Sequence, residues 1–348
     1  MKKIFVAMLA LAAATACSND ELVSVNQEAI GFDNAFINNS VRSVVDPSYK
    51  YDSKMFADFA VYGFVSADNQ APAAIFDGTQ VSGPDWTYEG TQYWINGARY
   101  NFNAVAPYND GWTKTEAGID SVKLSFTNDG ETDLLFATNN YGIYSYNENQ
   151  PVGKVGFNFR HVLSKVKFSF VNNYNATNSF LRVSNIKIEN AYTTANATLK
   201  ANTTAWEGHA GDNLELVFGN ANTTAQDTAA QKFAYNPESE VESHNELLLI
   251  PGAVPSFEKK VGEVVTGYKV TFTVDVLVGD AVIKTYRHVV AANFTPVAGY
   301  TYDLKAELSH ENLDPEQPQE AIEFTVTGIG GWDTDHNDDG EDNDETNI

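Results

Sequence analysis

Cysteine is almost absent from this sequence, whose 348 residues include a single one, Cys17. An intramolecular disulfide bond needs two cysteines, so no such bond can stabilise this chain. The stability of the fold must therefore come from the burial of apolar side chains and from backbone hydrogen bonds.

Basic residues are also scarce, because 22 lysines and arginines face 46 aspartates and glutamates and leave a net charge of −24. So acidic a surface repels nucleic acid and anionic lipid headgroups. The sequence therefore predicts no nucleic-acid partner, and it leaves a lipid anchor as the expected route to a membrane.

The usual motifs of catalysis and cofactor binding are missing as well. The six histidines show no H-x₃-H or H-E-x-x-H spacing, and there is no G-x-S-x-G elbow, P-loop or dinucleotide fingerprint. Residues 335–340 match the opening of a calcium loop, but Thr346 stands where the bidentate carboxylate belongs. We therefore predict no metal, no cofactor and no enzymatic activity, and we expect His161 to be a buried or edge histidine. A glycosidase stays open as an alternative, because two carboxylates can converge from distant strands.

The one long apolar run is N-terminal and ends at the cysteine. Two lysines precede residues 4–16, which are almost wholly apolar. This layout is typical of a signal peptide, and the run is shorter than the roughly 20 residues of a membrane-spanning helix. The position of Cys17 resembles a bacterial lipobox, with Ala14 in place of the usual leucine. We expect a lipoprotein signal peptide at 1–17 and lipidation of Cys17; an ordinary secreted protein is the alternative.

Long apolar stripes with a helical period are absent too, and the dominant pattern is alternation of apolar and polar residues. Such alternation is typical of strands with one face in a core and the other in water, and turn clusters such as Pro251-Gly252 separate them. We therefore predict an all-β, sandwich-like protein. The clearest apolar positions are Val122, Leu124 and Phe126; Val155, Phe157 and Phe159; Val166, Phe168 and Phe170; Ile186 and Ile188; Val270, Phe272, Val274 and Val276; and Tyr302, Leu304, Ala306 and Leu308.

The length of the chain predicts more than one domain. One hydrophobic core stops growing at ~250–300 residues, so we expect two domains with a boundary near the polar stretch 172–175. Residues 192–228, rich in Thr, Asn, Ala and Gly, are expected to form a surface excursion or an edge hairpin. The last sixteen residues, 333–348, contain eight Asp or Glu and no Lys or Arg, and we expect a disordered acidic tail.

Aromatic residues gather between positions 86 and 108, where two uses are open. They can stack on sugars, or they can pack in a core, and the alternation of Tyr100, Phe102, Ala104 and Ala106 favours packing. The cluster consists of Trp86, Tyr88, Tyr93, Trp94, Tyr100 and Tyr108.

Six short stretches, spread over nearly the whole mature chain, carry a family resemblance. They are Ala29-Ile30-Gly31-Phe32 with Ser40-Val41-Arg42, Tyr93-Trp94 with residues 99–107, Asp133-Leu134-Leu135-Phe136-Ala137, residues 159–166, residues 247–252, and residues 294–302. In this order they resemble the fimbrillin family of Bacteroidota fimbriae. The resemblance implies two tandem transthyretin-like β-sandwich domains in an exported lipoprotein that polymerises after proteolysis. The implied layout is an N-terminal strand segment at 18–42, sandwich domains at 43–174 and 175–332, a final strand at 321–332, and the tail 333–348.

The resemblance also implies an assembly mechanism. An Arg-specific protease would cut between Arg42 and Ser43 and release the strand that carries Ile30 and Phe32. A strand of a neighbouring subunit would then fill the opened groove, because an unpaired strand edge and exposed apolar area are satisfied by another strand. The candidate donor strand carries Ile322, Phe324 and Val326.

Two alternatives stay open for this mechanism. Arg42 is a plain surface arginine if residues 28–33 form a permanent first strand, as in anchor-type or non-polymerising members. Residues 321–332 can equally be the last strand of their own second domain. The acidic extension beyond Trp332 favours a minor, tip or adhesive role over a stalk role, because it would have to lie outside any acceptor groove.

We therefore predict a non-enzymatic pilus subunit, located as an outer membrane lipoprotein at the cell surface and in the fimbrium. Its expected partners are other pilin subunits, an Arg-specific protease, and a host or bacterial surface receptor. The alternative is a monomeric, non-polymerising surface lipoprotein that binds glycans through the aromatic cluster.

Overall fold

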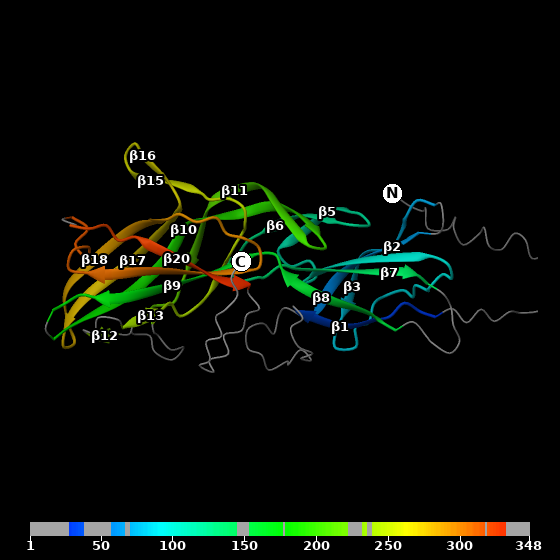
Figure 1. Cartoon of the computed structure of the whole chain (residues 1–348), viewed down its shortest axis with the longest axis horizontal. Helices are drawn as coiled ribbons and strands as arrows, with labels where there is room; N and C mark the ends of the chain where they lie inside the picture. The colour runs from blue at the N-terminus through cyan, green and yellow to red at the C-terminus, as the bar shows by residue number, and fades with distance from the viewer. Residues whose placement is uncertain are drawn as a thin grey trace, which may run out of the picture.

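The computed structural model describes residues 28–37, 57–66, 70–144, 153–176, 178–221, 232–234, 239–316 and 319–331. Every regular element among them is a β-strand, so the prediction of an all-β protein is confirmed. The molecule is elongated, with the N-terminal strands in blue and cyan toward one end and the yellow and orange strands toward the other (Figure 1).

The N-terminal half is built on a six-stranded sheet that begins and ends with edge strands β1 and β3. Strand β1 pairs in parallel with β8, and the other pairs in this sheet are antiparallel. In spatial order the strands are β1 (Phe32–Ile37), β8 (Val155–His161), β7 (Leu135–Ile143), β4 (Arg99–Ala106), β2 (Asp58–Ser66) and β3 (Ala73–Ser82).

A second sheet of seven strands runs through both halves of the molecule. Its long central strand pairs antiparallel with β17 over residues 179–188 and with β6 over residues 194–199. The strands in order are β18 (Ala281–Ala292), β17 (Tyr268–Val278), β10 (Ser179–Lys200), β6 (Val122–Thr127) and β5 (Trp112–Ala117), and β11 (Thr203–Val217) and β12 (Lys232–Ala234) also pair with β10.

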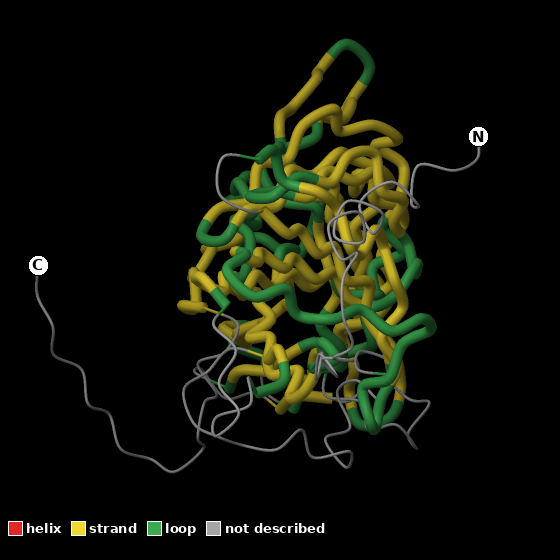
Figure 2. Tube along the Cα trace, turned by 90° about the vertical axis from the view of Figure 1, so that its right-hand side faces the viewer, coloured by secondary structure: helices red, strands yellow, loops and turns green. Residues whose placement is uncertain are grey.

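A third sheet of five strands faces the second in the C-terminal half. It consists of β13 (Glu240–Glu242), β9 (Ser164–Asn173), β19 (Tyr300–Ser309) and β20 (Phe324–Gly331), with β14 (Leu247–Leu249) also on β9. A separate hairpin, β15 (Ser256–Lys260) and β16 (Glu263–Thr266), projects from the body of the molecule at the top of Figure 2.

Three clusters of buried side chains hold these sheets together. The first core lies on one face of the six-stranded sheet, where Trp86, Tyr88 and Trp94 from a loop cover it. The middle core lies on the other face of that sheet, against β5, β6 and the second half of β10. The C-terminal core lies between β9, β19 and β20 on one side and β10, β17 and β18 on the other. The six-stranded sheet is therefore buried on both faces.

The alternating stretches of the sequence form strands with the expected inner faces. Strands β6, β8, β9, β17 and β19 place their predicted apolar positions in the cores and turn the residues between them outward. The expected edge hairpin within residues 192–228 is also confirmed for the described part, because β11 folds back on β10 and pairs with no other described strand.

Candidate functional site

The segment at residues 28–33 contributes two side chains to the first core. Ile30 and Phe32 are each 1% exposed, and the Phe32 ring is enclosed by five described aromatic rings. Its centroid lies 5.4 Å from Phe76, 5.5 Å from Tyr88, 6.0 Å from Phe157, 6.2 Å from Phe102 and 6.3 Å from Phe59. Aromatic pairs at these separations attract one another beyond the area that they bury, so Phe32 is the centre of this core and not its lid.

The backbone of the same segment is tied on both sides. The Ile30 amide donates to the Gln92 carbonyl at 2.8 Å, and the Trp94 amide donates to the Glu28 carbonyl at 3.0 Å. The hydroxyl of Tyr88 donates to the Ile30 carbonyl at 2.7 Å. Beyond residue 31 the chain continues as β1 along β8, in parallel. Loss of this segment would therefore leave an apolar groove beside an unpaired strand edge.

The candidate donor strand lies at the other end of the chain as β20, on the edge of the third sheet. It pairs antiparallel with β19 of its own chain. Phe324 packs against Phe168 at 5.4 Å, Phe272 at 6.2 Å and Phe170 at 6.4 Å, and Ile322 is 9% exposed. In this structure β20 therefore completes the C-terminal core.

Each of the two edge strands begins at a phenylalanine, and an isoleucine stands two residues before it. Ile30 and Phe32 enter the first core, and Ile322 and Phe324 enter the C-terminal core, in both cases from one face of the chain. Because residues two apart lie on the same face of a strand, each pair presents the same two side chains to its core.

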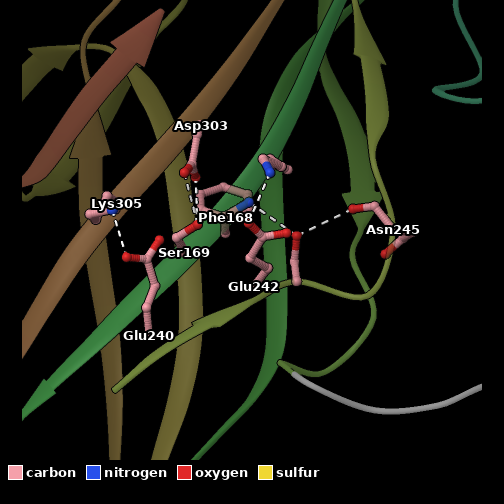
Figure 3. A network of polar contacts seen from close by, with 9 residues as sticks. Phe168, Ser169, Glu240, Glu242, Asn245, Asp303 and Lys305 are labelled. Atoms are coloured by element: carbon pink, nitrogen blue, oxygen red, sulfur yellow. Dashed lines mark hydrogen bonds and ion pairs between the residues drawn. The ribbon is translucent and has the colours of Figure 1, made fainter. Parts of the chain in front are cut away.

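A polar network holds the outer face of the sheet that carries β20 (Figure 3). Ser169 on β9 donates to both carboxylate oxygens of Asp303 on β19, at 2.8 and 2.9 Å. Lys305 of β19 pairs with Glu240 of β13 at 2.7 Å. Burial raises the pKa of the Asp303 carboxyl, and the hydrogen bond from Ser169 opposes that rise. These pairs join the strands that support β20, so the network has a structural role.

Two of the family-like stretches meet where β7 and β8 pair. The carboxylate of Asp133 contacts Nδ1 of His161, and both side chains are almost completely buried. The same carboxylate accepts a hydrogen bond from the Leu134 amide at 2.8 Å. His161 is therefore a buried histidine, as predicted, while its partner Asp133 was not foreseen.

The neighbouring Arg160 joins the two halves of the molecule. Its Nη2 donates to the carbonyls of Lys200 and Thr203, at 2.8 and 3.0 Å, where the β10–β11 hairpin turns. Nε1 of Trp206 on β11 donates in return to the Val162 carbonyl at 3.0 Å. Residues 160 and 162 of the stretch 159–166 thus have a structural role, since they dock this hairpin on the first half.

His288 on β18 is a titratable group that the sequence pattern did not single out. It is 5% exposed, and its ring stacks on Phe272 with centroids 5.0 Å apart. Burial lowers the pKa of its imidazole to about 4. Within the described part of the chain, its Nε2 atom has no hydrogen-bond partner.

We predict that His288 makes the protein less stable in acid. Between pH 6.5 and about 4 the unfolded chain binds a proton at this position and the folded chain does not, so the free energy of unfolding falls as the pH falls. The loss is at most about 3 kcal/mol by linkage. Denaturant unfolding at pH 7, 5.5 and 4.5 should show a shallower pH dependence for His288→Phe than for the wild type. A pH dependence of His288→Phe as steep as that of the wild type would contradict the prediction.

The aromatic cluster between residues 86 and 108 mostly packs inward. Trp94 is 3% exposed and Tyr100 is fully buried, with their rings 4.6 Å apart. Trp86, Tyr88 and Tyr108 pack against the first and middle cores. Tyr93 is 45% exposed, which leaves one ring of the six largely open to solvent. The interpretation as core packing is confirmed for these residues, and a sugar platform here has little surface.

Several expected sites lie outside the described residues. These are Cys17 with the signal peptide 1–17, the cleavage site at Arg42 and Ser43, and the acidic tail 333–348. Among the residues that the structure does describe, no helix is long and apolar enough to cross a membrane.

A sequence model of the fimbrillin-like family matches residues 52–332, and the chain therefore belongs to this family. Membership supports a fimbrial or adhesin-like protein at the cell surface that associates with other pilin subunits. It agrees with the prediction of a structural protein, because members of the family are fimbrial and adhesive proteins and not enzymes. No curated protein sequence matches the chain.

The solved structures that match this chain are remote in sequence. A candidate cell adhesion protein from Bacteroides uniformis is 15% identical, with a TM-score of 0.42 over 88% of this chain and 99% of that one. A second from Bacteroides ovatus is also 15% identical, with a TM-score of 0.42 over 88% and 98%. The fimbrial anchor protein Mfa2 from Porphyromonas gingivalis is 13% identical, with a TM-score of 0.31 over 80% and 90%.

Proposed function

We propose that this protein is a surface-exposed pilus subunit that assembles by protease-activated strand exchange and serves adhesion or scaffolding. The observation that carries the proposal is the position of Phe32, a ring at the centre of a core that belongs to a separable N-terminal segment. Lipidation of Cys17 would anchor the precursor in the outer membrane, with the folded domains on the cell surface. The proposed layout keeps two tandem transthyretin-like domains at 43–174 and 175–332.

Cleavage between Arg42 and Ser43 would separate Ile30 and Phe32 from the first core. Burying two such side chains contributes roughly 1.5–3 kcal/mol each, and the hydrogen bonds of the segment add to this. The trimmed subunit would expose the rings around Phe32 and the edge of β8. Only an extended segment with the same apolar spacing satisfies both the groove and the edge.

The proposed donor is the strand with Ile322, Phe324 and Val326. It is an edge strand close to the end of the described chain, so it can leave β19 without disturbing strands on both sides. Its Ile-x-Phe pattern matches that of Ile30 and Phe32, so the same two side chains would enter the groove of the next subunit. The binding gained there offsets the loss of its contacts with β19 and the C-terminal core.

The proposed domains share more structure than a simple boundary at residue 174 implies. Strand β9 precedes that boundary but pairs with β19 and packs in the C-terminal core. Strand β10 follows the boundary but also pairs with β6 of the first half. A subunit built in this way would present two sandwiches as one rigid body.

The second candidate function is a non-polymerising surface lipoprotein that binds glycans. The observation in its favour is that β1 and β20 each complete a core of their own chain in this structure. In that case Arg42 is an ordinary arginine and the protein needs no neighbouring subunit.

Strand exchange predicts different fates for four forms of the protein. After treatment with an Arg-specific protease, the wild type should form ladders that resist SDS, and mass spectrometry should find Ser43 as the new N-terminus and lipid on Cys17 of the released piece. Arg42→Ala should keep the groove closed and the protein monomeric. Phe324→Asp should be trimmed but should not ladder, because a carboxylate enters an apolar groove only at high cost.

The matched control is Thr325→Asp, which adds the same charge to the exposed face of β20. It should ladder as the wild type does. Equal behaviour of all four forms, whether laddered or monomeric, would reject strand exchange and leave the glycan-binding lipoprotein.

A further inference from the structure

The outer face of the sheet formed by β10, β17 and β18 is hollowed by a cleft of about 810 Å³. It lies on the face opposite to the C-terminal core. Six residues of its lining carry hydroxyl or amide side chains, namely Ser184, Asn185, Asn220, Thr271, Thr273 and Thr285. Such groups donate and accept hydrogen bonds in the way that the hydroxyls of a sugar require.

Both carboxylates of the cleft are already neutralised. Asp275 accepts hydrogen bonds from Nε of Arg182 at 3.0 Å and from the hydroxyl of Thr285 at 2.6 Å. Glu189 pairs with Lys269 at 2.6 Å and accepts a hydrogen bond from Thr271 at 2.9 Å. Neither carboxylate is therefore left to repel an anion or to demand a cation.

Arg287 on β18 is the uncompensated charge of the cleft. Lys187, the other basic residue of the lining besides Arg182, pairs with Glu215 at 3.0 Å. Arg287 is exposed, and no ion pair of the described part of the chain includes it. Other exposed basic residues of the described chain, Arg99 and Lys260 among them, also have no ion pair, so Arg287 is distinguished by its position in the cleft.

A β-bulge shapes the floor of the cleft. The pairing of β10 with β17 shifts register between Ser184 and Lys187, and Asn185 adopts a φ of 53°. This conformation is uncommon outside glycine and asparagine, and bulges re-aim side chains beside functional sites. The backbone amide of Asn185 donates to Oδ1 of Asn220 at 3.2 Å. This hydrogen bond brings the segment after β11 to the rim of the cleft.

We propose that this cleft binds a carboxylate-bearing oligosaccharide, so that it is the receptor site of the protein. The guanidinium of Arg287 can hold a carboxylate by two parallel hydrogen bonds, and the surrounding hydroxyls and amides hold the sugar. Val289 in the lining is 44% exposed and offers an apolar contact for a sugar ring. Acidic groups elsewhere on the surface repel the carboxylate of the ligand. At physiological salt this repulsion is largely screened beyond about 8 Å. The site is separate from β1 and β20 and does not depend on strand exchange.

The test is titration calorimetry of the intact mature protein in detergent with tetragalacturonate, a hyaluronan tetrasaccharide and sialyllactose. At least one of these acidic probes should bind, and its carboxyl-reduced form should bind at least tenfold more weakly. Arg287→Gln should weaken binding at least tenfold, and Thr273→Val should weaken it severalfold. Lys260→Gln removes the same charge from the projecting β15–β16 hairpin and should have no effect.

Three results of the sugar titrations would overturn the proposal, and a peptide competition gives a fourth. The three are the absence of binding to all three probes, equal binding of the carboxyl-reduced form, and an equal effect of Arg287→Gln and Lys260→Gln. A synthetic peptide of residues 333–348 is added as a competitor, and displacement of the sugar by this peptide at similar concentration would assign the cleft to the acidic tail instead. Laddering of Arg287→Gln after proteolysis should match the wild type, so failure here is distinguishable from failure of strand exchange.

Discussion

Replacement of Phe32 by alanine should lower the free energy of unfolding by about 3–5 kcal/mol, the usual range for removing a fully buried phenylalanine. The loss is expected at the upper part of this range, because five aromatic rings enclose Phe32 and none can move in without leaving another gap. Denaturant unfolding of the uncleaved protein, followed by tryptophan fluorescence, measures the effect.

The control for this substitution is Ile95→Ala in the same half of the molecule. Ile95 is 53% exposed, so its truncation should change the free energy of unfolding by no more than about 0.5 kcal/mol. If Phe32→Ala cost no more than Ile95→Ala, the segment at 28–33 would not be part of the folded core. The proposed consequence of its release would then disappear as well.

Replacement of Asp133 by alanine should be as damaging, at about 3–5 kcal/mol, because it breaks a buried contact between a carboxylate and an imidazole. The substitution removes the partner of His161 and the acceptor of the Leu134 amide. Both groups would remain buried without that carboxylate, which costs more than the hydrogen bonds themselves contributed. Thermal and denaturant unfolding at pH 7 measure the loss.

Two variants separate the buried pair from an ordinary ion pair. Asp77, which pairs with Lys114 at the surface, should cost at most about 1 kcal/mol when changed to alanine. Adding His161→Leu to Asp133→Ala should recover part of the loss, because the histidine no longer needs a partner. Strictly additive losses in the double variant would show that the two side chains do not act as a pair.

The strands were predictable from the sequence because alternation fixes which face of a strand is buried. Val166, Phe168 and Phe170 point inward as expected, and so do Tyr302, Leu304 and Ala306. Alternation does not fix which strand lies beside another. The parallel pairing of β9 with β19 therefore had no local signal, since Tyr302 pairs with Val166, 136 residues earlier in the chain. The same holds for β10, whose length of 22 residues lets it serve both halves.

The residues of the candidate sites also fall into those that were predicted from the sequence and those that were not. Ile30 and Phe32 were identified because the resemblance to the fimbrillin family implies a released N-terminal strand that ends before a cleavage site at Arg42. Arg287 and the hydroxyls of the cleft were not, because polar residues on the outer face of a strand look like any solvated surface until the bulge at Asn185 and the neighbouring strands bring them together. His288 was missed for the opposite reason, since only the pairing of β18 with β17 reveals that it is inside.

The long strand β10 has a mechanical consequence for a fimbrial or adhesin-like protein that comes under tension. It pairs with β17 over its first half and with β6 over its second, and its backbone is continuous between them. A force that separates the two halves must draw β10 lengthwise out of one of these ladders, so the hydrogen bonds of that ladder are loaded in shear and resist together. Under tension the hydrogen bonds of this ladder therefore share the load along the strand and do not break one after another.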